Sequence, residues 1–361
     1  MKKPKIVVLP PNRTRRNYSG GKLLDKMQDI NVPRDGNQPE DWVASTVVAR
    51  NPGLPEKVNE GLSHVDLNGG ISFKDLLMQD PGYYLGDEDK SELGFLVKIL
   101  DSSMRLHVQA HPTSKFARKY LSSCYGKLEF YYILETRDGV VPTIRLGFQH
   151  PPDEEEFLRV VKQQDIDAMD GWFEEIKVTE GEAWIVPGAV PHAIGAGVLL
   201  VEIMEPSDLV VRLEFEREGI IVPPPARFMG KNPEFAALMI DFSEATKDIA
   251  REKYQISPII VETSQSYIIE EYNIKKYTDA FIVQKITVKR GDEIFFPLKP
   301  MVCIGLEGRS SILDGENSRD VLKGTRFFKP AAVPTISFKQ GVDDEFTFLC
   351  CFPSNSDIKH L

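Results

Sequence analysis

The chain has 361 residues, of which 42% are hydrophobic and 27% charged, so it is globular in composition and long enough to bury a large core. Its formal charge of −10 argues against nucleic acid and anionic membranes as partners, because such a surface repels phosphate groups. No apolar stretch reaches the ~18 residues of a membrane span. Residues 1–11 lack the long apolar segment of a signal peptide. With four cysteines in no paired spacing, these features predict a cytoplasmic protein with free thiols.

The first hundred residues are rich in Pro, Gly and Asn, which predicts short strands joined by loops. The basic tract 13–22 is expected to be a solvated loop, and a helix is expected over 72–79. Strand-like apolar runs then predict strands at 92–111 with a turn over 101–105, at 128–134 and at 143–148.

Residues 151–173 interrupt this β pattern. Acidic residues 153–156 are typical of a first helical turn, and Phe157, Val160 and Val161 follow at helical spacing. We therefore expect a helical insert, after which strands resume. A second helical stretch is expected over 233–254, with Phe235, Leu238, Met239 and Phe242 on one packing face.

Three phrases share the form of a Gly, five residues and a strand-ending Pro, at 181–187, 291–297 and 324–330. They resemble the turn-and-strand phrase of cupin barrels. The resemblance implies a mainly β protein of two cupin (jelly-roll) barrels. The expected domains are a metal-binding unit over 1–232 with its helical insert, a helical linker over 233–254 and a second barrel over 255–361. The second barrel has no histidine before His360, so we expect it to be structural.

Histidine is informative here because the chain has only six. His107, Gln109 and His111 alternate along one predicted strand, so their side chains should share a face. Polar groups facing an apolar interior are costly unless they are hydrogen-bonded or bind a metal. A satisfied polar cluster and a metal site are both open from these residues alone. The other histidines outside the motifs, His64, His150 and His360, are expected at the surface.

A second cluster favours the metal. His192 lies five residues after Pro187, where the cupin phrase carries a metal-binding His, and Glu129 begins an apolar strand, an unusual place for a lone charge. Gln109, His111, Glu129 and His192 together offer two imidazoles and two oxygens. That donor set suits Zn²⁺, and Mn(II) or Fe(II) stay open as alternatives.

Four motifs in order resemble those of the type I mannose-6-phosphate isomerase family: VKILDSSMRLHVQAHP (97–112), GKLEFYYIL (126–134), VPGAVPHAIGAG (186–197) and VEIMEPSDLVVR (201–212). The likeness extends over most of residues 18–225 and is weaker beyond. It implies a zinc enzyme, with one ion per chain, that interconverts mannose 6-phosphate and fructose 6-phosphate. It also implies that Gln109, His111, Glu129 and His192 are the zinc ligands.

The same resemblance implies that Arg212 is the catalytic arginine, with Glu202 ten residues before it and Lys127 beside the ligand Glu129. An aldose–ketose isomerase needs a cation to stabilise an enediolate or hold the phosphate, which suits Arg212. It also needs a base, for which Lys127, Glu202 and waters that are not metal ligands are candidates. Alternatively, Arg212 forms a structural ion pair with Glu205 or Asp208.

His107 departs from the family, which normally has a serine there that helps to hold substrate phosphate. We expect His107, with Lys127 and Arg212, to contact substrate. Because of this departure, two alternatives stay open: an isomerase of another sugar, even an unphosphorylated one, and a cupin that binds sugar without turning it over. The sequence leaves the oligomeric state open.

Overall fold

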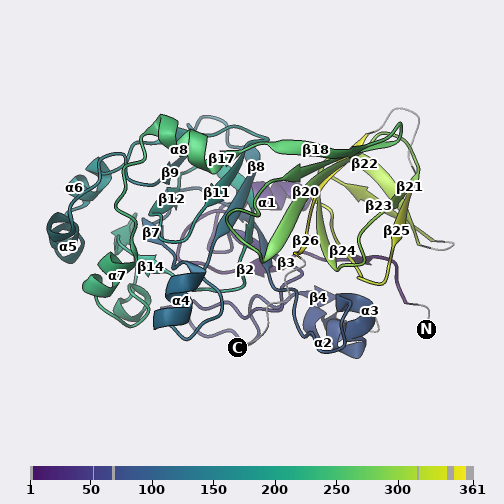
Figure 1. The fold of residues 1–361 in the computed structure, drawn as a ribbon, viewed down its shortest axis with the longest axis horizontal. Helices are drawn as coiled ribbons and strands as arrows, with labels where there is room; N and C mark the ends of the chain where they lie inside the picture. The colour runs from purple at the N-terminus through teal and green to yellow at the C-terminus, as the bar shows by residue number, and fades with distance from the viewer. Residues whose placement is uncertain (1–2, 52, 67–69, 315–316, 340–344, 355–361) are drawn as a thin grey trace.

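The computed structural model describes residues 3–51, 53–66, 70–314, 317–339 and 345–354. The described chain is mainly antiparallel β, as expected. The layers are stacked along the long axis of the molecule. Helices α5 (Glu154–Gln163) and α6 (Ile166–Gly171) lie at one end, followed by a five-stranded, a seven-stranded and a ten-stranded sheet (Figure 1). No helix in the described ranges is long and apolar enough to cross a membrane.

The two sheets that carry the predicted site face each other. The seven-stranded sheet has the order β17 (Gln255–Ile256), β11 (Ala183–Val186), β8 (Glu129–Thr136), β13 (Val198–Met204), β6 (Leu96–Asp101), β3 (Glu40–Val43) and β2 (Arg13–Thr14). The five-stranded sheet has the order β10 (Ile176–Lys177), β9 (Thr143–Leu146), β12 (His192–Ile194), β7 (Gln109–Ala110) and β14 (Val211–Arg212). Side chains of both sheets, such as Tyr131, Trp184 and Leu146, share one buried cluster between them.

Strands β8 and β13 are buried on both faces, which explains their nearly continuous apolar sequences. On β13, Leu200 points into the cluster between the two sheets, whereas Leu199 and Val201 pack against the ten-stranded sheet. Because side chains alternate along a strand, Glu202 of β13 shares the face of Leu200, and Glu129 of β8 shares the face of Tyr131. Both carboxylates therefore point into the space between the five- and seven-stranded sheets.

The ten-stranded sheet is built mainly from the C-terminal part of the chain. Its members are β1 (Val7–Val8), β24 (Arg326–Lys329), β22 (Met301–Asp314), β26 (Phe346–Pro353), β20 (Phe281–Val288), β19 (Tyr267–Tyr272) and β18 (Pro258–Thr263) in order, with β21 (Glu293–Phe295), β23 (Asn317–Leu322) and β25 (Thr335–Lys339) branching from this path. Strand β1 comes from the N-terminus and pairs with β24, so both ends of the described chain contribute to this sheet. Hydrogen bonds between the described strands give open sheets packed face to face.

The remaining elements are short. Two hairpins pair β4 (His64–Val65) with β5 (Ile71–Ser72) and β15 (Glu216–Arg217) with β16 (Ile220–Ile221). The helices are α1 (Lys22–Met27), α2 (Phe73–Gln79), α3 (Pro81–Leu85), α4 (Ser114–Tyr120), α5 (Glu154–Gln163), α6 (Ile166–Gly171), η1 (Pro224–Ala226), α7 (Pro233–Met239) and α8 (Lys247–Tyr254).

The expected helices at 72–79 and in the insert are present, and α5 covers the outer face of the five-stranded sheet with Phe157, Val160 and Val161. The single helical stretch expected over 233–254 is instead two helices, α7 and α8, separated by extended chain. The expected packing face is also wrong in part, because Leu238 is 61% exposed. Helices α1, α3 and α4 were not predicted from the sequence.

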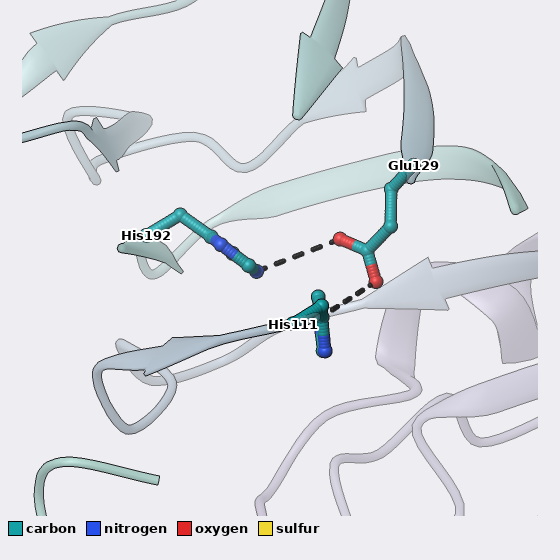
Figure 2. A group of neighbouring side chains, drawn as sticks. All are labelled: His111, Glu129 and His192. Carbon is teal, nitrogen blue, oxygen red and sulfur yellow. Dashed lines mark ion pairs between the residues drawn. The ribbon is translucent and has the colours of Figure 1, made fainter. Parts of the chain in front are cut away.

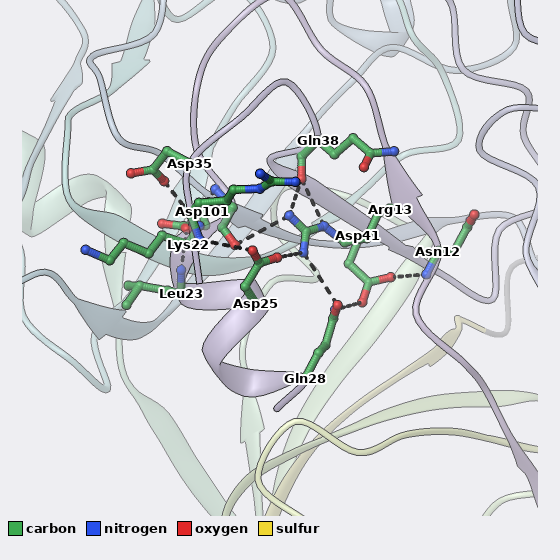
Figure 3. Close-up of polar contacts among 12 residues, drawn as sticks. Asn12, Arg13, Lys22, Leu23, Asp25, Gln28, Asp35, Gln38, Asp41 and Asp101 are labelled. Atoms are coloured by element: carbon green, nitrogen blue, oxygen red, sulfur yellow. Dashed lines mark hydrogen bonds and ion pairs between the residues drawn. The ribbon is translucent and has the colours of Figure 1, made fainter. Parts of the chain in front are cut away.

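The basic tract 13–22 is not a solvated loop. Figure 3 shows it inside a network of ion pairs and hydrogen bonds, where Arg13 Nη1 lies 2.7 Å from Asp25 Oδ1. The buried Asp101 accepts hydrogen bonds from the backbone N–H groups of Gly21 and Leu23, at 2.9 and 2.8 Å. Buried carboxylates need donors, and this segment supplies them.

A neighbouring buried carboxylate links the N-terminal segment to the ten-stranded sheet. Asp41 accepts a hydrogen bond from the backbone N–H of Asn12 at 2.7 Å and pairs with Arg326 of β24 at 2.9 Å. Asp41 is fully buried, so this ion pair crosses a dry contact between two sheets.

Candidate metal centre

Three buried side chains from different elements meet between the five- and seven-stranded sheets. Figure 2 shows Glu129 at the start of β8 between His192 of β12 and His111, which follows β7. His111 Nε2 lies 3.0 Å from Glu129 Oε1, and His192 Nε2 lies 3.5 Å from Glu129 Oε2. At most 2% of any of these side chains is exposed.

Backbone carbonyls fix the orientation of both imidazoles. His111 Nδ1 lies 2.8 Å from Leu209 O, and His192 Nδ1 lies 3.0 Å from Val190 O. A carbonyl only accepts, so each Nδ1 carries a hydrogen and donates it. Burial lowers the pKa of His111 to about 3 and also lowers the pKa of His192, so both rings are neutral at physiological pH. Each Nε2 therefore presents a lone pair toward Glu129.

Glu129 is an ionised carboxylate in this dry site. Burial opposes its ionisation, but the charge of Lys127 outweighs burial and holds the pKa of Glu129 well below its usual range. Tyr131 donates a hydrogen bond to Oε2 at 2.5 Å. Lys127 Nζ and His111 Nε2 lie 2.9 and 3.0 Å from Oε1, yet neither makes an aligned hydrogen bond to it. The Lys127 ammonium thus balances the charge of Glu129, while Oε1 still has room for an aligned partner.

The donor set fits a metal ion. The ligand atoms of His111, Glu129 and His192 all lie within 4.8 Å of one another, so two lone pairs and a carboxylate converge. Gln109 of β7 reaches the same point, with its amide nitrogen 3.4 Å from His192 Nε2, and rotating the amide would bring its oxygen there. Lys127 Nζ, 3.3 Å from His111 Nε2, offsets part of the repulsion among these acceptors, and nitrogen and oxygen donors in this number suit Zn²⁺. The structure thus brings together the four predicted ligands.

Two glycines let the ligand-bearing segments approach each other. A Cβ at Gly126 would collide with the backbone of residues 112–114, and a Cβ at Gly188 would collide with Thr113. Residues 112–114, against which both glycines pack, lead from His111 into α4. The N-cap of this helix, Thr113, accepts a hydrogen bond from the N–H of Phe116 at 3.1 Å. The glycines of the GK-x-E and VPG phrases are therefore required by close packing at the site.

A pocket opens beside this cluster. Its lining includes the predicted residues His107, Gln109, Lys127, Glu202 and Arg212. It also includes residues that the sequence analysis missed, among them Arg16, Tyr18, Glu40, Arg50, Lys98 and Asp208. The pocket is therefore rich in cations within a chain of net charge −10, which suits an anionic ligand.

Lys98 is the most informative of the missed residues. It is 2% exposed, its Nζ lies 3.2 Å from Glu202 and 3.9 Å from Glu40, and it sits over the Trp42 ring. Burial raises the pKa of Glu202, and the charge of the nearby Lys98 lowers this pKa by less than burial raises it. Lys98 interrupts the apolar strand β6, the same signal that drew attention to Glu202 and Glu129, so the sequence could have revealed it.

Glu40 marks the other end of this buried chain of charges. Burial alone would raise its pKa, but Arg16 and Lys98 outweigh burial and lower it to about 2. Arg16 Nε lies 2.8 Å from Glu40 Oε2, and Tyr18 donates a hydrogen bond to Oε1 at 2.7 Å. These contacts draw the N-terminal tract into the wall of the pocket.

Arg212 lies in the pocket without a close carboxylate. Its Nη1 donates to the carbonyl of Ala226 at 2.9 Å, and the described residues give it no ion pair within 4.0 Å. The alternative ion pair with Glu205 is wrong, since Glu205 bonds elsewhere, and Asp208 acts on Arg212 only from a distance. Burial lowers the pKa of Arg212 to about 10, which leaves it charged at neutral pH.

His107 lines the pocket, but one side of its ring is engaged. Nε2 lies 3.1 Å from the carbonyl of Ile220 in β16, so the imidazole ties the β15–β16 hairpin to the pocket wall. Away from the site, His64 and His150 are exposed as expected, and His360 lies outside the described residues.

The fold and the buried histidine–carboxylate cluster define a β-sheet protein with a candidate metal centre beside an anion-compatible pocket. No family model matches the chain. It is 32% identical over 148 residues to a Bacillus subtilis protein named "Probable mannose-6-phosphate isomerase GmuF", over 40% of this chain and 45% of that one. It is 28% identical over 137 residues to mannose-6-phosphate isomerase ManA of the same organism, over 38% of this chain and 42% of that one. The matches thus span less than half the length of these curated relatives.

Solved structures match over nearly the whole chain. The mannose 6-phosphate isomerase of Bacillus subtilis aligns with a TM-score of 0.70 and 19% identity, over 97% of this chain and 99% of that one. A mannose 6-phosphate isomerase with zinc and yttrium bound aligns with a TM-score of 0.68 and 15% identity, over 97% of this chain and 100% of that one. At these identities the solved structures show that the chain shares the fold of these isomerases.

Proposed function

We propose that this chain is a metal-dependent isomerase that interconverts mannose 6-phosphate and fructose 6-phosphate. The observation that carries the proposal is the convergence of His111, Glu129 and His192 beside a pocket that contains Lys127 and Arg212. The sequence relatives named as mannose-6-phosphate isomerases support the choice of substrate.

Gln109, His111, Glu129 and His192 would hold one Zn²⁺, for which their two imidazoles, carboxylate and amide are suitable donors. Bound there, the ion would polarise the oxygens on C1 and C2 of the sugar and so make the proton on carbon more acidic. Mn(II) and Fe(II) are the alternative occupants, which metal analysis of the purified protein separates.

The chain's own residues supply the remaining chemistry. Isomerisation removes a proton from C2 of the aldose and returns a proton to C1 of the ketose. Glu202 and Lys127 both line the pocket. The raised pKa of Glu202 suits a group that takes the proton from C2 and then delivers a proton to C1. Arg212, charged and without a carboxylate partner within 4.0 Å in the described chain, would bind the enediolate or the phosphate.

A second candidate, isomerisation of a different sugar, is favoured by His107. The imidazole stands where the family has a phosphate-binding serine, and its Nε2 is engaged by Ile220 O rather than directed at a ligand. A His107→Ser variant should then gain activity on the phosphorylated hexose. An unchanged rate would show that His107 is neutral toward the phosphate. A pure sugar binder is the outcome in which ligand binds but nothing turns over.

We further propose that the chain folds as two jelly-roll units joined by α7 and α8. The face-to-face five- and seven-stranded sheets would form the metal-binding unit, and the ten-stranded sheet the second. Separate buried clusters inside each set of sheets support this division. Pairing of β1 with β24 would then act as an arm from the first unit to the second.

A turnover assay tests the main proposal. Zinc-loaded protein is incubated with fructose 6-phosphate and the products are separated, with a His192→Ala variant as control. Mannose 6-phosphate formed only by the intact site supports the substrate, the reaction and the role of the metal together. No product from folded, metal-replete protein would reject the main proposal, and a screen of free sugars would then test the second candidate.

A further inference from the structure

Glu205 is a buried carboxylate that none of the chemistry above uses. It follows directly after β13 and is 7% exposed. Its Oε2 accepts hydrogen bonds from Ser114 Oγ at 3.0 Å and from the backbone N–H of Leu128 at 3.3 Å. Its Oε1 accepts one from Thr278 Oγ1 at 3.0 Å. Within the described ranges no cation lies within 4.0 Å, so these three neutral donors satisfy the charge.

The three donors come from three places that meet behind the candidate metal centre. Ser114 begins α4, three residues after His111. Leu128 stands between Lys127 and Glu129, and its carbonyl accepts a hydrogen bond from the N–H of Glu205 at 3.1 Å. Glu205 therefore bonds both backbone groups of Leu128, the N–H through its side chain and the carbonyl through its own N–H.

Ser114 extends this hold along the chain, because its Oγ also accepts a hydrogen bond from the N–H of Gly126 at 3.0 Å. Ser207 donates to the carbonyl of the same Gly126. The segment 126–129 is thus fixed at consecutive peptide groups by residues at 114, 205 and 207. Lys127 and Glu129, which point into the site, have their backbones set by this network.

Thr278 brings in the ten-stranded sheet. It is 6% exposed and lies in the loop between β19 and β20. A second contact runs parallel to it, where the Phe130 ring of β8 meets the Tyr272 ring of β19 at 5.1 Å between centroids. The ten-stranded sheet therefore contacts β8 directly through Tyr272, and its β19–β20 loop reaches the Leu128 backbone through Glu205.

We propose that Glu205 is a positioning residue, through which the ten-stranded sheet holds Lys127 and Glu129 in their working places. The proposal rests on the proposed function, because the site must bind a metal and a sugar for their placement to matter. The C-terminal sheet then has a part in catalysis although it contributes no residue to the pocket wall around the cluster.

The chemistry of the carboxylate makes a graded test available. A Glu205→Ala variant leaves the Ser114, Leu128 and Thr278 donors without an acceptor. A Glu205→Gln variant keeps an oxygen for Ser114 and Leu128, and its new NH₂ can donate to the Thr278 hydroxyl, which also accepts. A Thr278→Val variant removes the hydroxyl that links Glu205 to the β19–β20 loop, together with the acceptor for the N–H of Ala280 in that loop.

The experiment measures Co²⁺ binding by its visible absorption, and kcat and KM for fructose 6-phosphate, in the full-length wild type and the three variants. Loss of partners that orient ligands costs about 10- to 100-fold in metal affinity or activity. We expect Glu205→Ala to weaken Co²⁺ binding and lower kcat by that order, with an altered Co²⁺ spectrum and little change in KM. Glu205→Gln should restore most of both, and Thr278→Val should lie between.

A Glu205→Ala protein that melts at a lower temperature yet matches the wild-type Co²⁺ spectrum, affinity and kcat would overturn the proposal, since its role would be structural only. If Glu205→Ala does not fold, a Thr278→Val protein with wild-type Co²⁺ affinity and kcat overturns it instead. A wild type that neither binds Co²⁺ nor turns over sugar phosphate rejects the proposed function and this inference with it. A functional wild type with unaffected variants rejects the role of Glu205 alone.

Discussion

Replacing His192 by alanine should weaken metal binding strongly while leaving the fold intact. The imidazole is 2% exposed, and its Nε2 lies 3.5 Å from Glu129 Oε2 and 3.4 Å from the Gln109 amide. Its Nδ1–H is already engaged by Val190 O, so Nε2 is the atom that a metal would use. The substitution therefore removes one of four donors and leaves the other three in place.

The size of the effect follows from the donor count. Four-ligand protein zinc sites bind with roughly 10–16 kcal/mol of apparent free energy at neutral pH, or about 3 kcal/mol per ligand. Loss of His192 should then weaken zinc binding about 100-fold, because each 1.4 kcal/mol is a factor of ten. The fold should persist, because removing the ring also removes a lone pair that repels the Glu129 carboxylate when no metal is bound. This relief offsets part of the lost packing.

The measurement is zinc content at equilibrium across a series of buffered free-zinc concentrations, with circular dichroism to verify folding. His150→Ala is the matched control, since its imidazole is exposed and pairs with Glu174 on the surface. A His192→Ala protein with wild-type zinc affinity would refute the ligand assignment. Equal loss in both variants would refute it as well, because the effect would then not depend on the site.

Three further predictions concern stability and packing. Arg326→Leu leaves the fully buried Asp41 without its cation and should cost about 3–5 kcal/mol of unfolding free energy in urea, and adding Asp41→Asn should recover part of it. Glu40 has a pKa lowered from 4.5 to about 2, so it contributes stability above pH 4.5 that is lost as pH falls toward 2; by its shift this is about 3 kcal/mol. Glu40→Gln should therefore be less stable at pH 7 but lose less on acidification, and equal pH dependence in both proteins would contradict the assignment. Gly126→Ala should lower both zinc affinity and melting temperature because its Cβ has no room, whereas Gly171→Ala, where the space is open, should change neither.

Much of the fold could be predicted from local sequence patterns. Apolar strand-like runs predicted β6, β8 and β13, and helical spacing with an acidic first turn predicted α5. These patterns work because each element buries one regular set of side chains. They failed for α4 and for the break between α7 and α8, which are short and set by caps and contacts rather than by period. Leu238 looked like a packing residue and is exposed, because α7 buries Ala236, Ala237 and Met239 instead.

The candidate ligands could be read from the sequence because chemistry restricts residue type. Two histidines and a carboxylate are unusual in apolar strands unless they share a function. The motifs that contain Gln109, His111, Glu129 and His192 also include recognisable turn residues. The rest of the pocket was out of reach. Arg16 and Tyr18 belong to a tract that looks like a polar loop, and only their buried partner Glu40 shows that they form the wall.

The sequence by itself determined that this protein is mainly β, that it carries a histidine–carboxylate metal motif, and that the motif resembles one family. Tertiary structure alone decided which neutral imidazole nitrogens face Glu129, where Lys98 is buried, and how the C-terminal sheet reaches the site through Glu205 and Thr278. The physical reason is that residue type and periodicity are local properties of the chain. The pKa of a carboxylate and the partner of a hydroxyl depend instead on groups that lie far apart in sequence and meet only after folding.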